Sequence, residues 1–161
     1  MRVKDVMMRT AASCGRETNL GEAVSILWDR NCGILPVVDA EQKVIGVVTD
    51  RDLCIALGTR NRLPGDITVG DVTSGKVFAC AAEDDIRSAM ATMAQAKVRR
   101  LPVVTAERKL EGILSMDDVA MHSGTRIGKG ASELSSDDVV ETLKAVYRPQ
   151  LPEVVTRTAT A

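Results

Sequence analysis

The sequence predicts an α+β fold of two β-α-β-β-α repeats that pack on each other with pseudo-twofold symmetry, followed by a short C-terminal helical extension. The first observation behind this prediction is an internal repeat. A shift of 66 residues aligns residues 3–55 with residues 69–121 without a gap, and 15 of the 53 aligned pairs are identical. The second observation is that apolar patterns follow the same order in both copies. A unit of about 55 residues buries only part of its apolar surface alone, so we expect the two copies to pack together.

Each copy begins with a short extended segment and an amphipathic helix. The extended segments are predicted at residues 12–14 and 77–80. In the first copy Asn19 is placed to cap the helix, and Glu22 follows three residues later, as in a capping box. Apolar residues then recur at helical spacing. They are Leu20, Ala23, Val24 and Leu27 in the first copy and Ile86, Ala89, Met90 and Met93 in the second.

Two strands and a second helix complete each copy. The strands are predicted at residues 34–38, 44–49, 100–104 and 110–115, with a polar turn inside each pair. The second helix begins at Asp50 in the first copy and at Met116 in the second. Gly58 is suited to end the first of these two helices in the left-handed conformation.

These elements divide the chain into three parts. Residues 1–66 hold the first repeat and its linker, residues 67–122 hold the second repeat, and residues 123–161 hold a C-terminal loop, helix and tail. Ser136 or Asp137 is expected to cap the last helix, which should end near Tyr147 because prolines follow. The tail from residue 154 onwards is expected to be mobile.

The composition argues against several classes of function. The formal net charge is −1 and only three aromatic residues occur, so we expect neither a nucleic-acid partner nor a membrane surface. No apolar run approaches the ~20 residues of a membrane helix, and the N-terminus lacks the apolar core of a signal peptide. The cysteines form no C-x-x-C pair and His122 is the only histidine, so we expect no metal site. A cytoplasmic protein with reduced cysteines follows from these observations.

A polar corner follows the last strand of both copies. Thr49 and Ser115 each stand where a strand ends and a helix begins, and Asp52 and Asp118 follow three residues later. Unpaired N–H groups at such a junction favour an anion, and a carboxylate at this spacing can accept hydrogen bonds from a ribose diol. The alternative is that these residues only start the helices, where Ser, Thr and Asp are common. Their recurrence at matching positions favours a ligand site.

Basic residues stand near both corners. Arg51 is placed to offset phosphate charge in the first copy, whereas Arg99 and Arg100 precede the buried strand of the second copy. Alternation along the strand should point one residue of this pair inwards and the other outwards. A guanidinium at the mouth of a strand suits a phosphate group, although a solvated strand end is an alternative interpretation.

With these residues on view, the chain resembles the tandem cystathionine β-synthase (CBS) domain pair, also called a Bateman module. The resemblance covers about residues 1–122 and rests on the motifs VKDVM, GILPVVDAEQKVIGVVTDRDL, VRRLPVV and GILSMDDV. It implies two clefts that bind adenosine compounds such as AMP, ADP, ATP or S-adenosylmethionine as regulatory ligands, with Mg²⁺ accompanying ATP and no required cofactor. It also implies a homodimer formed through helices. Leu53, Ile55 and Leu57 are the candidate exposed apolar residues on such a helix.

The resemblance also implies which residues bind the nucleotide. One cleft would join Ile113, Ser115, Asp118, Arg99 and Arg100 to Thr18, Ala23, Cys32 and Gly33. The other cleft would join Val47, Thr49, Arg51 and Asp52 to Asp84, Ala89, Val98 and Arg99. We expect the cleft at Ser115 to be the better nucleotide site, because it has the basic pair and the small Gly33.

We therefore expect a non-catalytic regulatory module, a sensor of adenine nucleotides or a related metabolite whose downstream protein target the sequence does not name. A nucleotide hydrolase with Mg²⁺ on the clustered aspartates is disfavoured, because adjacent residues on a helix point apart. A phosphate-loop interpretation of GTRIGKG, residues 124–130, fails on its spacing. An adaptor with vestigial clefts is the remaining alternative, and its C-terminal helix would dock a partner through an apolar face. That face consists of Val139, Val140, Leu143 and Val146, and its other interpretation is packing on its own domain or dimer mate.

Overall fold

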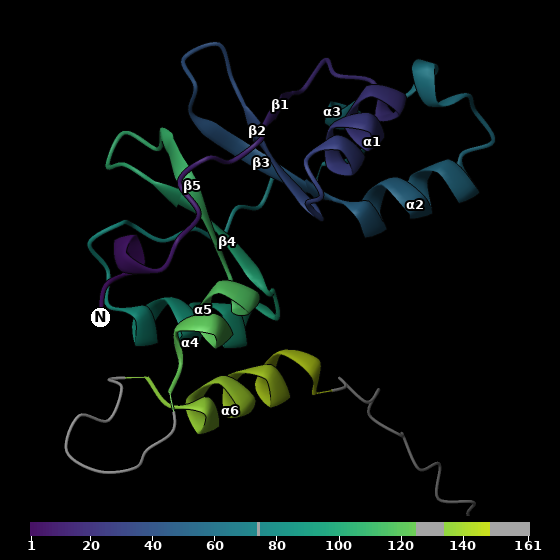
Figure 1. Cartoon of the computed structure of the whole chain (residues 1–161). Helices are drawn as coiled ribbons and strands as arrows, with labels where there is room; N and C mark the ends of the chain where they lie inside the picture. The colour runs from purple at the N-terminus through teal and green to yellow at the C-terminus, as the bar shows by residue number, and fades with distance from the viewer. Residues whose placement is uncertain (74, 125–133, 149–161) are drawn as a thin grey trace, which may run out of the picture.

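The computed structural model describes residues 1–73, 75–124 and 134–148, which form two similar α+β units and one further helix (Figure 1). The first unit contains β1 (Cys14–Gly15), α1 (Leu20–Asp29), β2 (Ile34–Val38), β3 (Val44–Thr49) and α2 (Asp50–Thr59). The second unit contains α4 (Ile86–Ala96), β4 (Arg100–Val104), β5 (Leu110–Ser115) and α5 (Met116–His122). Short helices η1 (Val3–Asp5), η2 (Pro64–Asp66) and α3 (Val69–Val72) precede or connect the units, and α6 (Ser136–Tyr147) follows them.

The sheets confirm the duplication in detail. β2 pairs antiparallel with β3, and β4 pairs antiparallel with β5. The register is equivalent in the two units, with Ile34 opposite Thr49 and Arg100 opposite Ser115. Parallel β1 joins the first sheet, whereas its counterpart in the second unit is a single bridge between Cys80 and Val103. All four predicted strand ranges and both predicted starts of the second helices are therefore correct. The helix α2 extends one residue beyond the predicted stop at Gly58, to Thr59.

The segment that precedes each repeat packs on the other repeat. The N–H of Val3 donates to the carbonyl of Asp84, and Met8 bridges Ile113 with a pair of 2.9 Å hydrogen bonds. In the opposite direction, the N–H of Leu20 donates to the carbonyl of Ile67. Val3, Val6 and Met7 belong to the core of the second unit, and Ile67 and Val69 belong to the core of the first. Packing thus crosses the predicted division of the chain between residues 66 and 67.

Two glycines admit these exchanged segments. A Cβ atom on Gly112 of β5 would clash with the backbone carbonyl of Met8, and a Cβ on Gly46 of β3 would clash with the side chain of Thr73. These glycines occupy equivalent positions under the 66-residue shift. The glycine before each polar corner is therefore required by close approach of another segment, through the backbone of Met8 at Gly112 and through the side chain of Thr73 at Gly46.

The two hairpins meet at their turns. The N–H of Val44 donates to the carbonyl of Arg108 over 2.9 Å, and the Arg108 guanidinium donates back to the carbonyl of Val44 over 3.0 Å. Gln42 and Arg108, which are equivalent residues, both adopt left-handed conformations with φ of 64° and 66°. The pseudo-twofold relation therefore extends to the turn geometry.

The helix α6 packs along α4 and α5 and extends the core of the second unit (Figure 1). Val139 and Val146 are buried in that core and Leu143 packs against it, whereas Val140 is 46% exposed. Three of the four residues of the predicted apolar face therefore pack on their own domain. Ser135 caps α6, one residue before the predicted Ser136 or two before Asp137.

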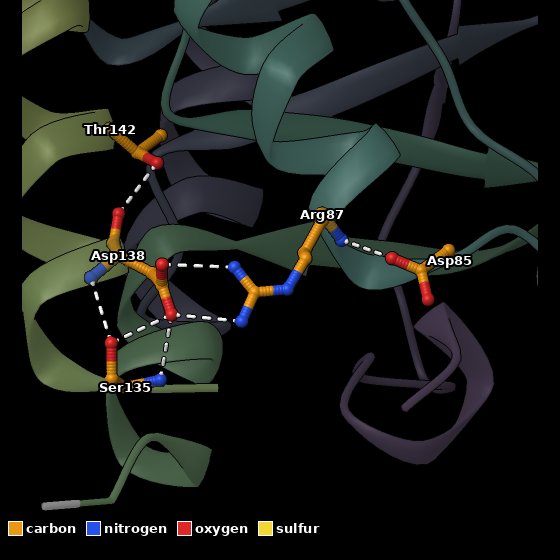
Figure 2. Close-up of polar contacts among 5 residues, drawn as sticks. All are labelled: Asp85, Arg87, Ser135, Asp138 and Thr142. Atoms are coloured by element: carbon orange, nitrogen blue, oxygen red, sulfur yellow. Dashed lines mark hydrogen bonds and ion pairs between the residues drawn. The ribbon is translucent and has the colours of Figure 1, made fainter. Parts of the chain in front are cut away.

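An ion pair anchors the beginning of α6. Arg87 of α4 donates to both carboxylate oxygens of Asp138, over 2.9 Å and 3.0 Å, and Ser135 donates to the same carboxylate (Figure 2). These contacts hold the pKa of Asp138 well below its usual range, with the Arg87 hydrogen bond the largest cause. The anchor ties the C-terminal extension to the second repeat.

Some predictions lie outside the described residues, namely the loop after Gly124 and the tail from residue 154. In the three described stretches, no helix has both the length and the apolar character needed to cross a bilayer. Leu53, expected to be exposed, is buried in the first core because it faces inwards from α2, and only Ile55 of the three candidate residues is exposed.

Candidate functional site

Both polar corners form capping boxes at the start of a helix. The Thr49 hydroxyl donates to Oδ2 of Asp52 over 2.7 Å, and the backbone N–H of Thr49 donates to the same oxygen over 2.9 Å. The equivalent contacts from Ser115 to Oδ2 of Asp118 measure 2.5 Å and 3.0 Å. The helix-start interpretation of these residues therefore describes what they do in the fold.

Location distinguishes these two capping boxes from others in the chain. Thr68 with Asp71, and Ser135 with Asp138, form the same box, but they line neither of the cavities described below. Asp52 and Asp118 also keep Oδ1 free of hydrogen bonds to any described residue, whereas Arg87 uses the second oxygen of Asp138. A free carboxylate oxygen facing a cavity can accept a hydrogen bond from a ligand hydroxyl.

The first cavity lies at the Thr49 corner and has a volume of about 620 Å³. Two acidic residues, Asp50 and Asp52, line it. Five basic residues also line it: Arg51, Lys76, Lys97, Arg99 and Arg100. Its apolar wall includes Val47, Phe78, Val98, Pro102 and Val146. An excess of three positive charges (five minus two) beside an apolar wall suits an anionic ligand with a flat apolar group.

The second cavity lies at the Ser115 corner and has a volume of about 460 Å³. Its charged residues are balanced, with Arg30 and Arg100 against Asp117 and Asp118. Met8, Ala11, Ala12 and Ile113 supply apolar surface. The exchanged N-terminal segment thus forms part of this site.

A shared wall separates the two cavities. Gly33, Ile34 and Arg100 line both of them. In their hairpins, Ile34 stands opposite Thr49 and Arg100 stands opposite Ser115. Ile34 and Arg100 are thus equivalent residues of the two repeats, and each lies beside the polar corner of its own repeat. The Arg100 guanidinium lies 3.8 Å from a carboxylate oxygen of Asp117, so part of its charge is already offset.

Most of the predicted site residues line a cavity. In the first cavity the structure brings together Val47, Thr49, Arg51, Asp52, Val98 and Arg99. In the second it brings together Cys32, Gly33, Arg100, Ile113, Ser115 and Asp118.

Other predicted residues lie elsewhere. Arg99 lines only the first cavity, so the basic pair does not serve the Ser115 corner as a pair, in keeping with the alternation expected along the strand. Ala23 and Ala89 are buried core residues of α1 and α4. The Thr18 hydroxyl accepts a hydrogen bond from the Gly15 N–H, and the Asp84 carboxylate accepts one from the Ala81 N–H. None of these last four lines either cavity.

Several cavity residues had no prediction from the sequence. Lys76 and Phe78 stand beside or within the extended segment predicted at 77–80, so their position before the second repeat was a usable indication. Tyr147 reaches the first cavity only because α6 packs on the second unit, and no sequence pattern indicated that contact.

The two buried cysteines, Cys14 and Cys80, are poorly suited to act as reactive thiols. Burial is the main cause that raises the pKa of Cys14 to about 11 and that of Cys80 to about 12, so both thiols stay protonated near neutral pH. Residues 1–73, 75–124 and 134–148 contain no group of three or more His, Cys, Asp or Glu side chains that could hold a metal ion.

Comparison with known proteins finds the CBS domain twice in the chain, at residues 3–59 and residues 69–124. The uncharacterized protein YlbB of Bacillus subtilis is 31% identical over 140 residues, covering 85% of this chain and 93% of YlbB. The crystal structure of CBSX2 in complex with AMP is similar with a TM-score of 0.63 and 28% identity, covering 73% of this chain and 91% of CBSX2.

A third comparison supports the fold. The CBS domain pair of protein MJ0100, crystallised with 5′-methylthioadenosine and S-adenosyl-L-methionine, has a TM-score of 0.69 at 23% identity. It covers 75% of this chain and 94% of the MJ0100 chain.

Proposed function

The chain belongs to the CBS domain family, and from that premise we propose that it is a non-catalytic regulatory module that binds adenosine-containing ligands in its two cavities. One observation carries the proposal: at each cavity a capping-box aspartate, Asp52 or Asp118, keeps one carboxylate oxygen free of hydrogen bonds to the described residues. That oxygen is the acceptor a ribose diol requires. The similarity to CBSX2, whose structure contains AMP, favours AMP or a related nucleotide as the ligand.

Charge assigns different ligands to the two cavities. The first cavity, with its excess of basic residues, is the proposed site for AMP, ADP or ATP, whose phosphates would face Arg51 and Arg99. The second cavity has balanced charges and is the proposed site for an adenosine compound with little net charge, such as S-adenosylmethionine. The structure thus shifts our preference for nucleotides from the Ser115 corner to the Thr49 corner, because Arg99 lines only the latter.

The proposed role is sensing in the cytoplasm, without a reaction. Asp50 and Asp52 line the first cavity, but Oδ2 of Asp52 is engaged in the capping box and Asp50 accepts from the Arg51 N–H. Among the described residues, each aspartate thus keeps one oxygen free of hydrogen bonds, and the proposal assigns that of Asp52 to a ligand hydroxyl rather than to Mg²⁺. Ligand occupancy would be read by a protein target that contacts the module.

A homodimer is part of the proposal. Trp28 and Val24 on α1 and Ile55 on α2 expose apolar surface on the helical side of the first repeat. The equivalent side of the second repeat carries α6. A second copy of the chain would therefore pack on the first repeat.

The test of the proposed function compares Asp52→Ala with Asp71→Ala. Both variants lose one capping box, which costs about 0.5–2 kcal/mol of folding stability. Only Asp52→Ala also removes the free oxygen at the first cavity, so we expect it to weaken AMP binding by roughly 1–3 kcal/mol while Asp71→Ala binds as the parent does.

Isothermal titration calorimetry with AMP is the measurement, after a thermal-shift panel of AMP, ADP, ATP, NAD and S-adenosylmethionine has identified ligands that stabilise the fold. Asp118→Ala provides the matching test at the second cavity with S-adenosylmethionine. Equal AMP affinity in the parent and in Asp52→Ala would reject the ribose role of Asp52. Turnover of ATP by the parent protein in the presence of Mg²⁺ would reject the non-catalytic role.

A further inference from the structure

The C-terminal end of α6 reaches the first cavity. Val146 and Tyr147, the last two residues of α6, line this cavity and not the second. Both residues follow residue 124, where the match to the second CBS domain ends. The first cavity is therefore built from the two repeats and from a helix outside them.

Tyr147 contacts Arg99, an exposed cation that lines this cavity, in two ways. Its hydroxyl accepts a hydrogen bond of 2.8 Å from Nη1 of Arg99, and the Arg99 guanidinium lies 5.7 Å from the centre of its ring. The guanidinium has five N–H donors in a fixed planar arrangement, so one bond to Tyr147 orients the plane and leaves donors for another acceptor.

Tyr147 is itself held in place by the packing of α6. Val146, its neighbour, is buried in the core of the second repeat. The ammonium group of Lys97 donates to the carbonyl of Arg148 over 2.8 Å, and the ion pair between Arg87 and Asp138 fixes the other end of the helix (Figure 2). The backbone of Tyr147 is therefore held at the end of α6, and its side chain, which is 60% exposed, extends to Arg99.

We propose that Tyr147 is a positioning residue that holds Arg99 ready for the phosphate of a nucleotide in the first cavity, which rests on the proposed function. A free arginine side chain loses rotamer freedom when it binds a phosphate, and a side chain already ordered by Tyr147 loses less. The gain applies only to ligands that use Arg99. The C-terminal helix thus makes the first cavity selective for a nucleotide over a nucleoside.

The experiment measures AMP and adenosine binding by calorimetry in an Asp118→Ala background, which leaves the first cavity as the intact site. Tyr147→Phe removes the hydroxyl and keeps the ring, so α6 should stay packed, and circular dichroism melting checks this. We expect Tyr147→Phe to lower the AMP affinity by about two- to tenfold and to leave the adenosine affinity unchanged. Lys144→Ala, on the exposed face of the same helix, is the matched control and should change neither affinity.

The outcomes separate this inference from the function on which it rests. An unchanged AMP affinity in Tyr147→Phe would overturn the positioning role and leave the proposed function intact. An equal loss of AMP and adenosine affinity would also overturn it, because such a loss does not act through the phosphate. In an Asp52→Ala background only the second cavity is intact, so Tyr147→Phe should change neither the AMP affinity nor the adenosine affinity. A change in either affinity there would overturn the assignment of Tyr147 to the first cavity. Absence of AMP and adenosine binding to the unmutated protein would reject the nucleotide site proposed for the first cavity and this inference together.

Discussion

At the scale of single residues, one carboxylate serves both the fold and the proposed ligand. Oδ2 of Asp52 and of Asp118 completes a capping box, while Oδ1 is free of bonds to the described residues. The box fixes the direction in which the free oxygen points before any ligand arrives. Binding at these corners therefore needs little rearrangement of the acceptor, which lowers its entropy cost.

The sequence identifies these polar corners, but it does not predict which of them line a cavity. Four pairs with Ser or Thr followed three residues later by Asp form the same box, at Thr49, Thr68, Ser115 and Ser135. Only two of them line a cavity described here. The three-residue spacing predicts the start of a helix. Whether a cavity lies beside that helix start depends on how segments far apart in the sequence pack, and the residues of one corner do not predict that packing.

The glycine before the second corner yields a prediction about stability. Gly112→Ala should cost about 1–3 kcal/mol, because the new Cβ meets the carbonyl of Met8, whose backbone is held by two hydrogen bonds to Ile113. Gly46→Ala, the equivalent change in the first repeat, should cost less, because its Cβ meets a methyl group of the Thr73 side chain. Urea unfolding of the two variants and the parent measures the difference. A larger loss in Gly46→Ala would contradict the role given to the Met8 backbone.

At the scale of elements, α6 adds residues to the core of the second repeat and to the first cavity, and the sequence of α6 does not predict its contact with the cavity. The capping residues predict the helix and the prolines that follow predict its end near Tyr147, and α6 spans Ser136–Tyr147. Its contacts with α4 and α5, and hence the place of Tyr147 in the first cavity, combine the burial of Val139 and Val146 with the anchor between Arg87 and Asp138. These two residues lie 51 positions apart, and nothing in their local sequence pairs them.

The anchor of α6 should make the protein sensitive to acid. The pKa of Asp138 in the folded protein lies below its usual value of about 3.9, so the fold favours the ionised carboxylate. This contribution to stability is present above pH about 4 and is lost as the pH falls through the lower folded value. Asp138→Asn should therefore melt at a lower temperature than the parent at pH 7, and the difference should shrink as the pH falls below about 4.

Melting curves between pH 3 and pH 7 provide the measurement. Asp137→Asn is a suitable control, because Asp137 stands in the same helical turn without contacting Arg87 among the contacts of the described residues. A difference between Asp138→Asn and the parent that stays constant across this pH range would show that the anchor does not depend on charge.

At the scale of the whole molecule, pseudo-twofold symmetry explains what the sequence predicted well. Strand limits, helix starts and the duplication follow from local patterns that occur twice, so each copy checks the other. The exchange of leading segments was not predicted, because Val3 and Val69 have the same pattern whichever repeat they cover. Likewise, Ala23 and Ala89 fit a helical stripe in the sequence, and only the packed core shows that they do not line the described cavities.

The two repeats differ in how much of their helical surface is covered, and this difference predicts where a second copy of the chain binds. Val24 of α1 is 40% exposed, whereas its counterpart Met90 of α4 is 4% exposed and shares a core with Val139 and Val146 of α6. The first repeat has no such cover among the described residues, and Trp28 on the same helix is 85% exposed. The apolar surface that Val24 and Trp28 expose on one helix of the first repeat favours a dimer that uses this repeat.

Trp28→Ala should therefore weaken the proposed homodimer by at least about 30-fold in Kd, since a central tryptophan commonly contributes 2 kcal/mol or more to an interface. Met121→Ala is the matched control, because Met121 is 84% exposed on α5 of the second repeat and should lie outside the contact. Sedimentation equilibrium measures Kd for the parent and both variants. In the parent, Trp28 is the single tryptophan, so its fluorescence should shift to longer wavelength on dilution as the indole becomes exposed to water. An equal loss of affinity in the two variants would mean that both repeats contribute to the contact, and a parent that is monomeric at all concentrations would reject the dimer.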